Sequence, residues 1–269
     1  MAKRLSKKRL SCLLESLYRT YNRRELISPD PLQFLYEYRE PEDRELVGFV
    51  ASSLAYGRVA MILSSVARLL APLGSHPRAA LADATRSSLI DSWGDFKHRF
   101  TPVAEVADVL LAVRDVIGDG TIGSWIGKSF SRTSDLTASW DEFAGAVEDQ
   151  AGRTSLVCRP SRKSSCKRAF LFMRWMVRHD GVDPGGWDDV PPSALVVPLD
   201  THMFRVARLF GLTRRKGAGL ATAREITEAF RRLRPDDPVR YDFTLTRWGI
   251  RPDMTYRELE RIAEGADEP

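Results

Sequence analysis

The amino-acid sequence predicts an all-α fold, and three observations support that prediction. Apolar residues recur at three- and four-residue spacing along residues 45–56 and 59–70, which is typical of helices with one buried face. Signals for helix starts recur along the chain. No stretch alternates apolar and polar residues as a half-buried strand does, and residues 194–197 form the only strand candidate. We therefore expect about 11 to 14 helices.

Several helix starts can be placed from capping signals. Thr101 and Pro102 predict an N-cap and a first helical residue, and the apolar pattern after them extends to about Ile117. Three sequences match the capping box, in which two side chains satisfy free amides of a helix start; they begin at Ser139, Thr222 and Thr255. Residues 180–198, with three Gly and four Pro, form an unusually long loop, which favours a functional role.

The composition is that of an ordinary globular protein. Of 269 residues, 43% are apolar and 29% are charged, which excludes a disordered chain, a collagen and a coiled-coil rod. No apolar run reaches the roughly 18 residues of a membrane helix, and the basic start is not followed by an apolar signal segment. We therefore expect a cytoplasmic protein without a membrane partner. The three scattered cysteines predict no disulfide framework and no metal site, and we expect no cofactor.

The net charge of +5 hides a strong segregation of charge. Residues 1–24 carry +7, residues 159–178 carry +7 and residues 202–216 carry +5, so the rest of the chain carries −14. This pattern predicts a surface that faces a polyanion on an otherwise acidic body. The alternative is three separately solvated faces.

The first motif with chemical potential covers residues 165–177, S-C-K-R-A-F-L-F-M-R-W-M-V. A polar loop runs into an almost wholly apolar helix, whose first turn carries Lys167 and Arg168. The positive end of a helix dipole is an unfavourable place for cations, which suits a lysine that must lose its proton to act as a nucleophile. The alternative is that both cations contact phosphate together with the free amides of the helix start.

The second motif is V-P-L-D-T-H at residues 197–202. Asp200 is well placed to cap a helix that ends near Phe210, before Gly211. One carboxylate oxygen can cap while the other does chemistry. His202 is either structural or catalytic.

The third motif covers residues 52–58, between two apolar helices. Gly57 permits a sharp turn, from which Tyr56 could stack on a base and Arg58 could hold a phosphate. The alternative is a core tyrosine and a surface arginine.

These motifs resemble a known superfamily. Residues 198–206, P-L-D-T-H-M-F-R-V, are similar to the V-D-T-H-x-x-R-V segment of the endonuclease III-like, helix-hairpin-helix DNA glycosylases, in which the Asp is the catalytic carboxylate. Lys167 falls on the Lys of their G-x-K-T-A sequence. Residues 45–77 resemble the F-E-L-L-I-A-x-x-L-S-A-Q region, which supplies a residue that enters the DNA gap, and Tyr56 lies near that position. The PLDTH arrangement also resembles an uncharacterised bacterial family of this size.

The resemblance covers roughly residues 42–250 and has three departures. Residues 158–165 read C-R-P-S-R-K-S-S where the superfamily has its L-P-G-x-G-x-x-T hairpin. Lys167 and Asp200 are 33 positions apart, which is longer than in endonuclease III and similar to the archaeal oxidised-guanine glycosylases. The C-terminal four-cysteine motif is absent, so no iron–sulfur cluster is expected.

The resemblance implies two helical lobes with a DNA groove between them. Residues 30–185 would carry Lys167, and residues 1–29 with 190–269 would carry Asp200. The implied activity is base-excision repair by a DNA glycosylase with AP lyase activity, with Lys167 as the nucleophile and Asp200 as the activating carboxylate. The partner would be double-stranded DNA with a damaged base, which we expect to be an oxidised purine because of the Lys/Asp spacing. The protein would be a nucleoid-associated monomer.

Further residues are expected to contact DNA or the base. The expected DNA contacts are Tyr56, Arg58, Arg162, Lys163, Ser165, Arg168, His202 and Arg205. The expected aromatics of the base pocket are Trp175, Trp187 and Phe243. Two alternatives stay open: a non-catalytic DNA- or structured-RNA-binding protein on the same scaffold, and a monofunctional glycosylase in which Asp200 activates water. The separation of Lys167 and Asp200 is the most informative single distance.

Overall fold

The computed structural model describes residues 6–162 and 164–265. Within them the chain forms thirteen α-helices, five short 3-10 helices and one two-stranded hairpin. The α-helices are α1 (Lys7–Tyr21), α2 (Pro41–Ser53), α3 (Val59–Leu70), α4 (Pro77–Ala82), α5 (Arg86–Trp93), α6 (Val103–Ile117), α7 (Ile122–Thr133), α8 (Leu136–Ala151), α9 (Lys167–Val177), α10 (Thr201–Leu209), α11 (Leu220–Arg231), α12 (Asp242–Ile250) and α13 (Tyr256–Glu264). The other elements are η1 (Arg24–Leu26), η2 (Pro31–Glu37), η3 (Ala71–Leu73), η4 (Pro160–Arg162), η5 (Pro192–Ala194), β1 (Lys97–His98) and β2 (Thr101–Pro102).

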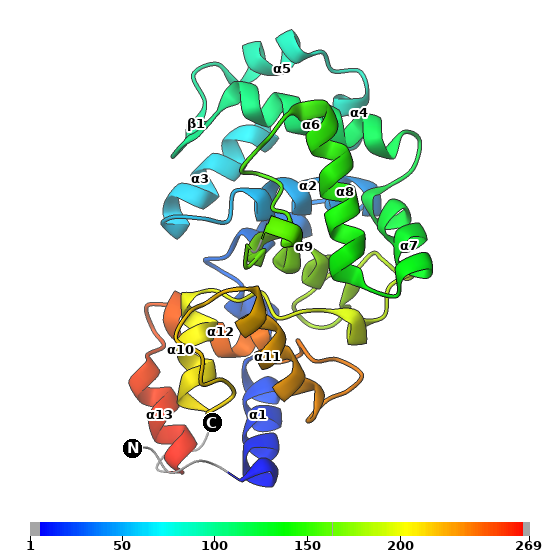
Figure 1. Ribbon diagram of the computed structural model, residues 1–269. Helices are drawn as coiled ribbons and strands as arrows, with labels where there is room; N and C mark the ends of the chain where they lie inside the picture. The colour runs from blue at the N-terminus through cyan, green and yellow to red at the C-terminus, as the bar shows by residue number, and fades with distance from the viewer. Residues whose placement is uncertain (1–5, 163, 266–269) are drawn as a thin grey trace.

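The helices form two groups, one above the other in Figure 1. The upper group contains α2 to α9, in which α8 packs on α6 and α7, and α9 packs on α2. The lower group contains α1 and α10 to α13, in which α12 contacts α1, α10 and α13. The first and the last described helices, α1 and α13, thus both lie in the lower group. None of the helices in the described ranges combines the length and apolar character needed to cross a membrane.

The mostly helical prediction is confirmed, with one local exception. Residues 97–102 form an antiparallel hairpin in which Lys97 pairs with Pro102 and His98 with Thr101. Residues 194–197, the strand candidate, form no strand: Ala194 ends η5 and no ladder follows in the described chain. A two-lobed helix-hairpin-helix fold is not established, because residues 152–166 join α8 to α9 through a long connection that includes η4.

Local capping explains which predicted helix starts are correct. Thr255 and Glu258 form the predicted capping box of α13. Ser139 does not start a helix, because Asp135 caps the amides of Thr137 and Ala138 one turn earlier. Thr222 also lies inside its helix, which starts after Gly219. Pro102 is the N-cap of α6 rather than its first residue, while the helix ends at Ile117 as predicted.

The long loop after α9 is held down by a buried carboxylate. Glu45, on α2, accepts hydrogen bonds from the backbone amides of Ile122 and Gly123 at 2.8 and 2.7 Å, which caps α7. It also accepts a bond of 2.7 Å from Nε1 of Trp187, in the loop. Burial raises the pKa of Glu45, although these three donors oppose the shift. The side chain of Trp187 packs so closely on Gly123 that a Cβ there would clash with it.

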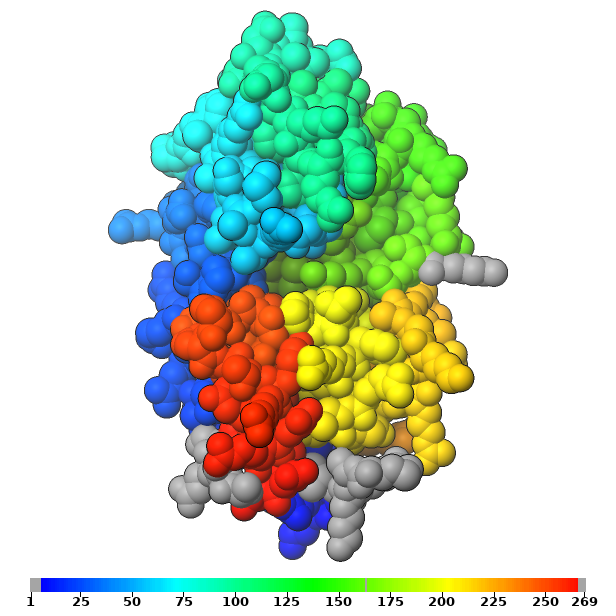
Figure 2. Space-filling view, turned by 90° about the vertical axis from the view of Figure 1, so that its left-hand side faces the viewer, coloured from blue at the N-terminus to red at the C-terminus, as the bar shows by residue number. Residues whose placement is uncertain are grey.

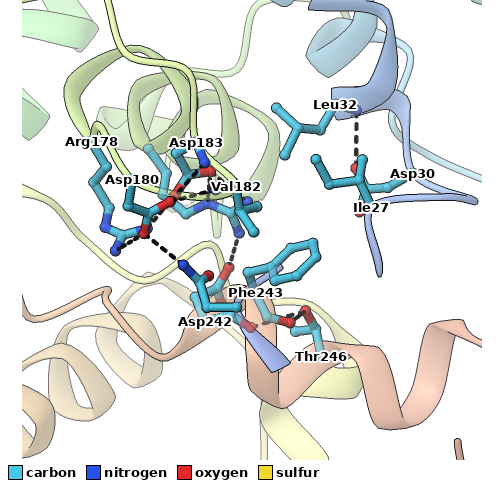
Figure 3. A network of polar contacts seen from close by, with 12 residues as sticks. Ile27, Asp30, Leu32, Arg178, Asp180, Val182, Asp183, Asp242, Phe243 and Thr246 are labelled. Atoms are coloured by element: carbon cyan, nitrogen blue, oxygen red, sulfur yellow. Dashed lines mark hydrogen bonds and ion pairs between the residues drawn. The ribbon is translucent and has the colours of Figure 1, made fainter. Parts of the chain in front are cut away.

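A buried network of arginines and aspartates joins the two groups of helices (Figure 3). Arg174, on α9, bonds to Asp183 in the following loop and to Asp242 at the start of α12. Arg178 bonds to Asp183 and to Asp237, which precedes α12. The side chains of Arg174 and Arg178 are only 3% exposed, so their charges depend on these carboxylates rather than on water.

Two further connections tie the N-terminal segments into this network. Asp180 accepts hydrogen bonds of 2.9 Å from Tyr18 and 3.0 Å from Asn22, both at the end of α1. Although burial opposes it, the charge of Arg178 and the amides of Asp183 and Val182 hold the pKa of Asp180 at about 2. The two helix groups are therefore linked by charged contacts on several sides rather than by a single hinge.

We expect Arg174→Leu to destabilise the protein by about 3–5 kcal/mol at pH 8, because Asp242 would be left buried without its cation and Asp183 would keep only Arg178. Burial raises the pKa of both carboxyl groups, that of Asp242 to about 6. A group with a raised pKa lowers stability as it ionises, so the loss should be smaller at pH 5 than at pH 8. Urea unfolding at both pH values measures it. Arg224→Leu, on the exposed face of α11, is the control and should change stability little at either pH.

Candidate functional site

A pocket of about 240 Å³ lies where the two groups of helices meet. Apolar residues such as Ala55, Ile62 and Leu171 form part of the lining from the upper group. The charged lining residues come from both groups: Lys167 and Arg174 from α9, Asp200 from the N-cap of α10, and Asp242 and Arg247 from α12. Figure 2 shows this side of the molecule. A recess there separates the cyan segment of the upper group from the orange segment of the lower group. The volume is below the roughly 300–1,000 Å³ typical of drug-sized ligands, so the pocket fits a small group.

Lys167 and Asp200 meet in this pocket. Nζ of Lys167 lies 3.7 Å from Oδ2 of Asp200, and the two side chains are 33% and 13% exposed. Lys167 stands in the first turn of α9, and Asp200 caps α10, where its other oxygen, Oδ1, accepts a bond of 2.7 Å from the amide of Met203. One oxygen thus caps the helix while the second faces the lysine. The two sequence motifs are brought together by the fold.

A third carboxylate faces the same pocket. Asp242 is 2% exposed and lines the cavity. Its Oδ2 accepts a hydrogen bond from Arg174, but its Oδ1 has no hydrogen-bond partner among the described residues. Burial raises the pKa of Asp242 to about 6; the charge of Arg174 opposes the shift and that of Asp200 adds to it. A buried carboxylate oxygen without a donor disfavours the charged form of the group, in agreement with the raised pKa of Asp242.

The charges that line the pocket balance one another. Arg247 is a third cation in the pocket lining, besides Lys167 and Arg174. Its guanidinium donates a hydrogen bond of 2.7 Å to Asp30 and lies 4.2 Å from the ring centre of Phe243. Asp30 in turn caps η2 through the amide of Leu32. Each cation therefore has a carboxylate partner, and the pocket combines apolar walls with fixed charges.

His202 and Arg205 both contact one tyrosine beside the pocket. His202 lines the cavity, and its Nδ1 lies 2.7 Å from the hydroxyl of Tyr256. The guanidinium of Arg205 stacks 4.0 Å from the centre of the Tyr256 ring. Gly249 also lines the pocket, and a Cβ at this position would clash with both Tyr256 and His202. His202 is thus fixed in place, and the exposed Arg205 is oriented by stacking.

The residues near the corner between α2 and α3 differ in accessibility. Arg58 is exposed at the N-cap of α3. Tyr56 is half-buried, and its hydroxyl lies 2.7 Å from Oγ1 of Thr101 and donates to the carbonyl of His98 at 3.1 Å. Arg168 lies 5.0 Å from the centre of the Tyr56 ring, and it donates hydrogen bonds to the carbonyls of Ser53 and Ser155.

The basic window at residues 159–178 is largely neutralised inside the protein. Arg162 forms a two-bond ion pair with Glu148, at 2.6 Å for each bond, and Arg159 pairs with Asp141 at 2.8 Å. Ser165 is half-buried in the loop before α9. Lys163 lies outside the described residues. The expectation that the described cations of this window face a polyanion needs correction, because the acidic remainder of the chain supplies their partners.

The three expected pocket aromatics lie elsewhere. Trp175 and Phe243 are completely buried, and Trp187 is held by its bond to Glu45; none of the three lines the pocket. Trp175 and Phe243 pack in the core from α9 and α12. The pocket walls come instead from smaller apolar side chains.

Several charged pocket residues were missed by sequence reasoning. An arginine in an otherwise apolar helix, as at Arg174, is a usable signal, because a buried cation requires a carboxylate. Asp30, Asp242 and Arg247 carried no comparable signal, because their roles depend on partners far away in the sequence. The described residues contain no cluster of three or more His, Cys, Asp or Glu side chains arranged to hold a metal ion.

Comparison with known proteins places the chain in a family. A family model described as a protein of unknown function (DUF2400) matches residues 30–251, which is most of the chain. The chain belongs to the DUF2400 family. The matched region contains α2 to α12 and both members of the Lys167–Asp200 pair. Neither the comparison with curated proteins nor that with solved structures found a match.

We expect Asp200→Ala to lose about 1 kcal/mol of stability, because α10 loses the cap on the amide of Met203. Asp200→Asn should keep that cap, since Asn is as good an N-cap as Asp. Urea denaturation of the two variants and the wild type measures the difference. Equal losses in both variants would mean that the charge of Asp200, rather than its capping oxygen, supports the fold.

Proposed function

We propose that this DUF2400 protein is a DNA glycosylase with AP lyase activity, with Lys167 as the nucleophile and Asp200 as the activating carboxylate. The observation that carries the proposal is the 3.7 Å approach of Lys167 Nζ to Asp200 Oδ2 in a partly open pocket between two groups of helices. A nucleophile beside a base that is itself oriented by a third group is the arrangement expected of covalent catalysis. Here the amide of Met203 orients Asp200.

The chemistry follows from that pair. Asp200 takes a proton from the Lys167 ammonium, and the freed nitrogen lone pair attacks C1′ of the sugar. The bond between C1′ and the base nitrogen breaks, its electron pair leaves with the base, and the base is protonated. Opening of the sugar ring gives a Schiff base on Lys167. Loss of a proton from C2′ then expels the 3′ phosphate, which cuts the strand.

An oxidised purine is the base that we propose as substrate, because the 33-residue spacing of Lys167 and Asp200 in the sequence resembles that of the archaeal oxidised-guanine glycosylases. The apolar part of the pocket lining can receive the face of a flipped base.

A second candidate is a non-catalytic protein that binds DNA or structured RNA on the same scaffold. The connection between α8 and α9 favours it, because residues 152–166 stand where a glycosylase hairpin would bind phosphate. Arg159 and Arg162 of this connection are also paired with Asp141 and Glu148. This candidate predicts duplex affinity without any product.

Borohydride trapping on duplexes with an abasic site or an oxidised purine tests the proposal. We expect the wild type to form a covalent adduct that peptide mapping locates at Lys167, and Lys167→Ala to form none. Asp200→Asn should slow the reaction at least about 100-fold, the usual contribution of a positioned proton acceptor, while the fold is kept.

The matched control is Lys128→Ala, an exposed lysine on α7, which should form the adduct at the wild-type rate. An adduct of normal yield in Lys167→Ala contradicts the lyase role. Base release without strand cutting would identify a monofunctional glycosylase instead. Salt-dependent duplex binding with no product on any lesion, unchanged by Asp200→Asn, would favour the binding protein.

A further inference from the structure

The tip of the β1–β2 hairpin presents the most exposed large apolar side chain in the described part of the protein. Phe100 is 84% exposed, and the next such residue, Met61, is 56% exposed. The tip consists of only two residues, Arg99 and Phe100, between the paired positions His98 and Thr101. A single exposed apolar side chain is common on protein surfaces, so its surroundings decide whether it has a role.

The base of the hairpin is fixed firmly to the upper group of helices. His98 and Thr101 are 1% and 0% exposed. Burial lowers the pKa of His98, so its ring is neutral at pH 7. Nε2 can therefore donate to the carbonyl of Tyr56 at 3.1 Å while Nδ1 accepts from Ser65 at 2.8 Å. Phe100 thus stands at the end of an anchored hairpin.

The guanidinium of Arg99 lies near two aromatic rings at the hairpin tip. Arg99 has a φ of +53°, the left-handed backbone conformation that two-residue hairpin turns commonly require at their first central position. Its guanidinium lies 5.6 Å from the ring centre of Phe100 and 6.0 Å from that of Tyr56.

Several cationic side chains lie near the hairpin tip. Phe100 shares a surface depression with Glu105 and four arginines. Two of these, Arg159 and Arg162, are paired with Asp141 and Glu148, so Arg153 and Arg168 are the arginines of the depression without a carboxylate partner among the described residues. Glu105 is already bonded to Thr154 and Ser155. Lys97, at the start of β1, is exposed as well. An aromatic surrounded by cations suits a partner with flat rings and negative charges, which is the composition of a nucleic acid.

The tip adjoins the pocket that holds Lys167 and Asp200. Gly57 lines that pocket, and a Cβ on Gly57 would lie 3.0 Å from Cδ of Arg99. The side chain of Arg99 therefore covers the pocket rim at Gly57, with Phe100 next to it in the chain. The tip therefore adjoins both the pocket, through Arg99, and the arginine depression, through Phe100.

We propose that the hairpin tip is a DNA wedge, in which Phe100 stacks within the base stack of a duplex and Arg99 binds the adjacent phosphate. Apolar side chains that enter a base step hold the duplex open, and the gap beside a flipped base is such a place. Tyr56, which we expected in this role, supports the hairpin from below through its hydroxyl. The proposal rests on the proposed function for the flipped base, but its test needs no catalysis.

The test is binding to a duplex that contains a tetrahydrofuran abasic-site analogue, which the lyase chemistry cannot cut. Phe100→Ala should weaken binding about tenfold, because loss of one aromatic–base stack costs about that much. Phe100→Trp should bind like the wild type, and the fluorescence of the new tryptophan should be quenched by the duplex. Met61→Ala, at the other exposed apolar residue, is the control and should change affinity less than about twofold.

Each other outcome overturns the wedge. Wild-type affinity in Phe100→Ala, or unquenched tryptophan in a bound Phe100→Trp complex, excludes stacking. A wild-type protein that does not bind the duplex also contradicts it, and so does a protein that binds anionic vesicles through Phe100 but not the duplex. The two proposals fail separately: normal trapping with an unaffected Phe100→Ala variant removes only the wedge. Phe100-dependent duplex binding without any trapped adduct removes only the enzyme.

Discussion

The pocket depends on the buried contacts of Arg174 and Arg178 with the aspartates around them. These guanidiniums project from the end of α9, and two of their partners lie in the other group of helices: Asp242 at the start of α12 and Asp237 in the segment before it. Neither cation has access to water, so separation from its carboxylates would strongly destabilise the folded state. The ion pairs therefore favour one relative position of α9 and α12. That position brings the first turn of α9, with Lys167, opposite the N-cap of α10, with Asp200. The site is thus a consequence of how the core charges are paired.

Local signals in the sequence were sufficient for the elements that hold the pair. Asp200 caps α10, Lys167 opens α9, and α3 spans residues 59–70, because capping and apolar spacing act within a few residues. The same rules failed at Ser139 and Thr222, where an earlier residue begins the helix and the capping sequence falls inside it. Local rules find candidate helix starts, but neighbouring candidates compete.

What the sequence could not reveal is which distant groups become partners. The charge of residues 159–178 suggested an open basic face, yet Asp141 and Glu148 neutralise Arg159 and Arg162. Trp187 is an aromatic residue of the kind expected in a base pocket, but its side chain packs against Gly123. Phe100, which no motif singled out, became visible only through its exposure on an anchored hairpin. Charge counts and aromatic content indicate that a side chain needs an interaction. Only the fold shows whether its partner is another residue of the protein or a ligand.

The pairing of α9 with α12 has a mechanical consequence. Rotation of one helix group against the other would separate Arg174 from Asp242 in the interior, and the partly buried pairs Arg178–Asp237 and Tyr18–Asp180 beside them. Breaking such contacts costs several kcal/mol, so closure by hinge bending is disfavoured. A ligand must therefore adapt to a preformed cavity. If that ligand is duplex DNA, bending and base extrusion are distortions of the nucleic acid, and sequences that deform readily will reach the lysine most often.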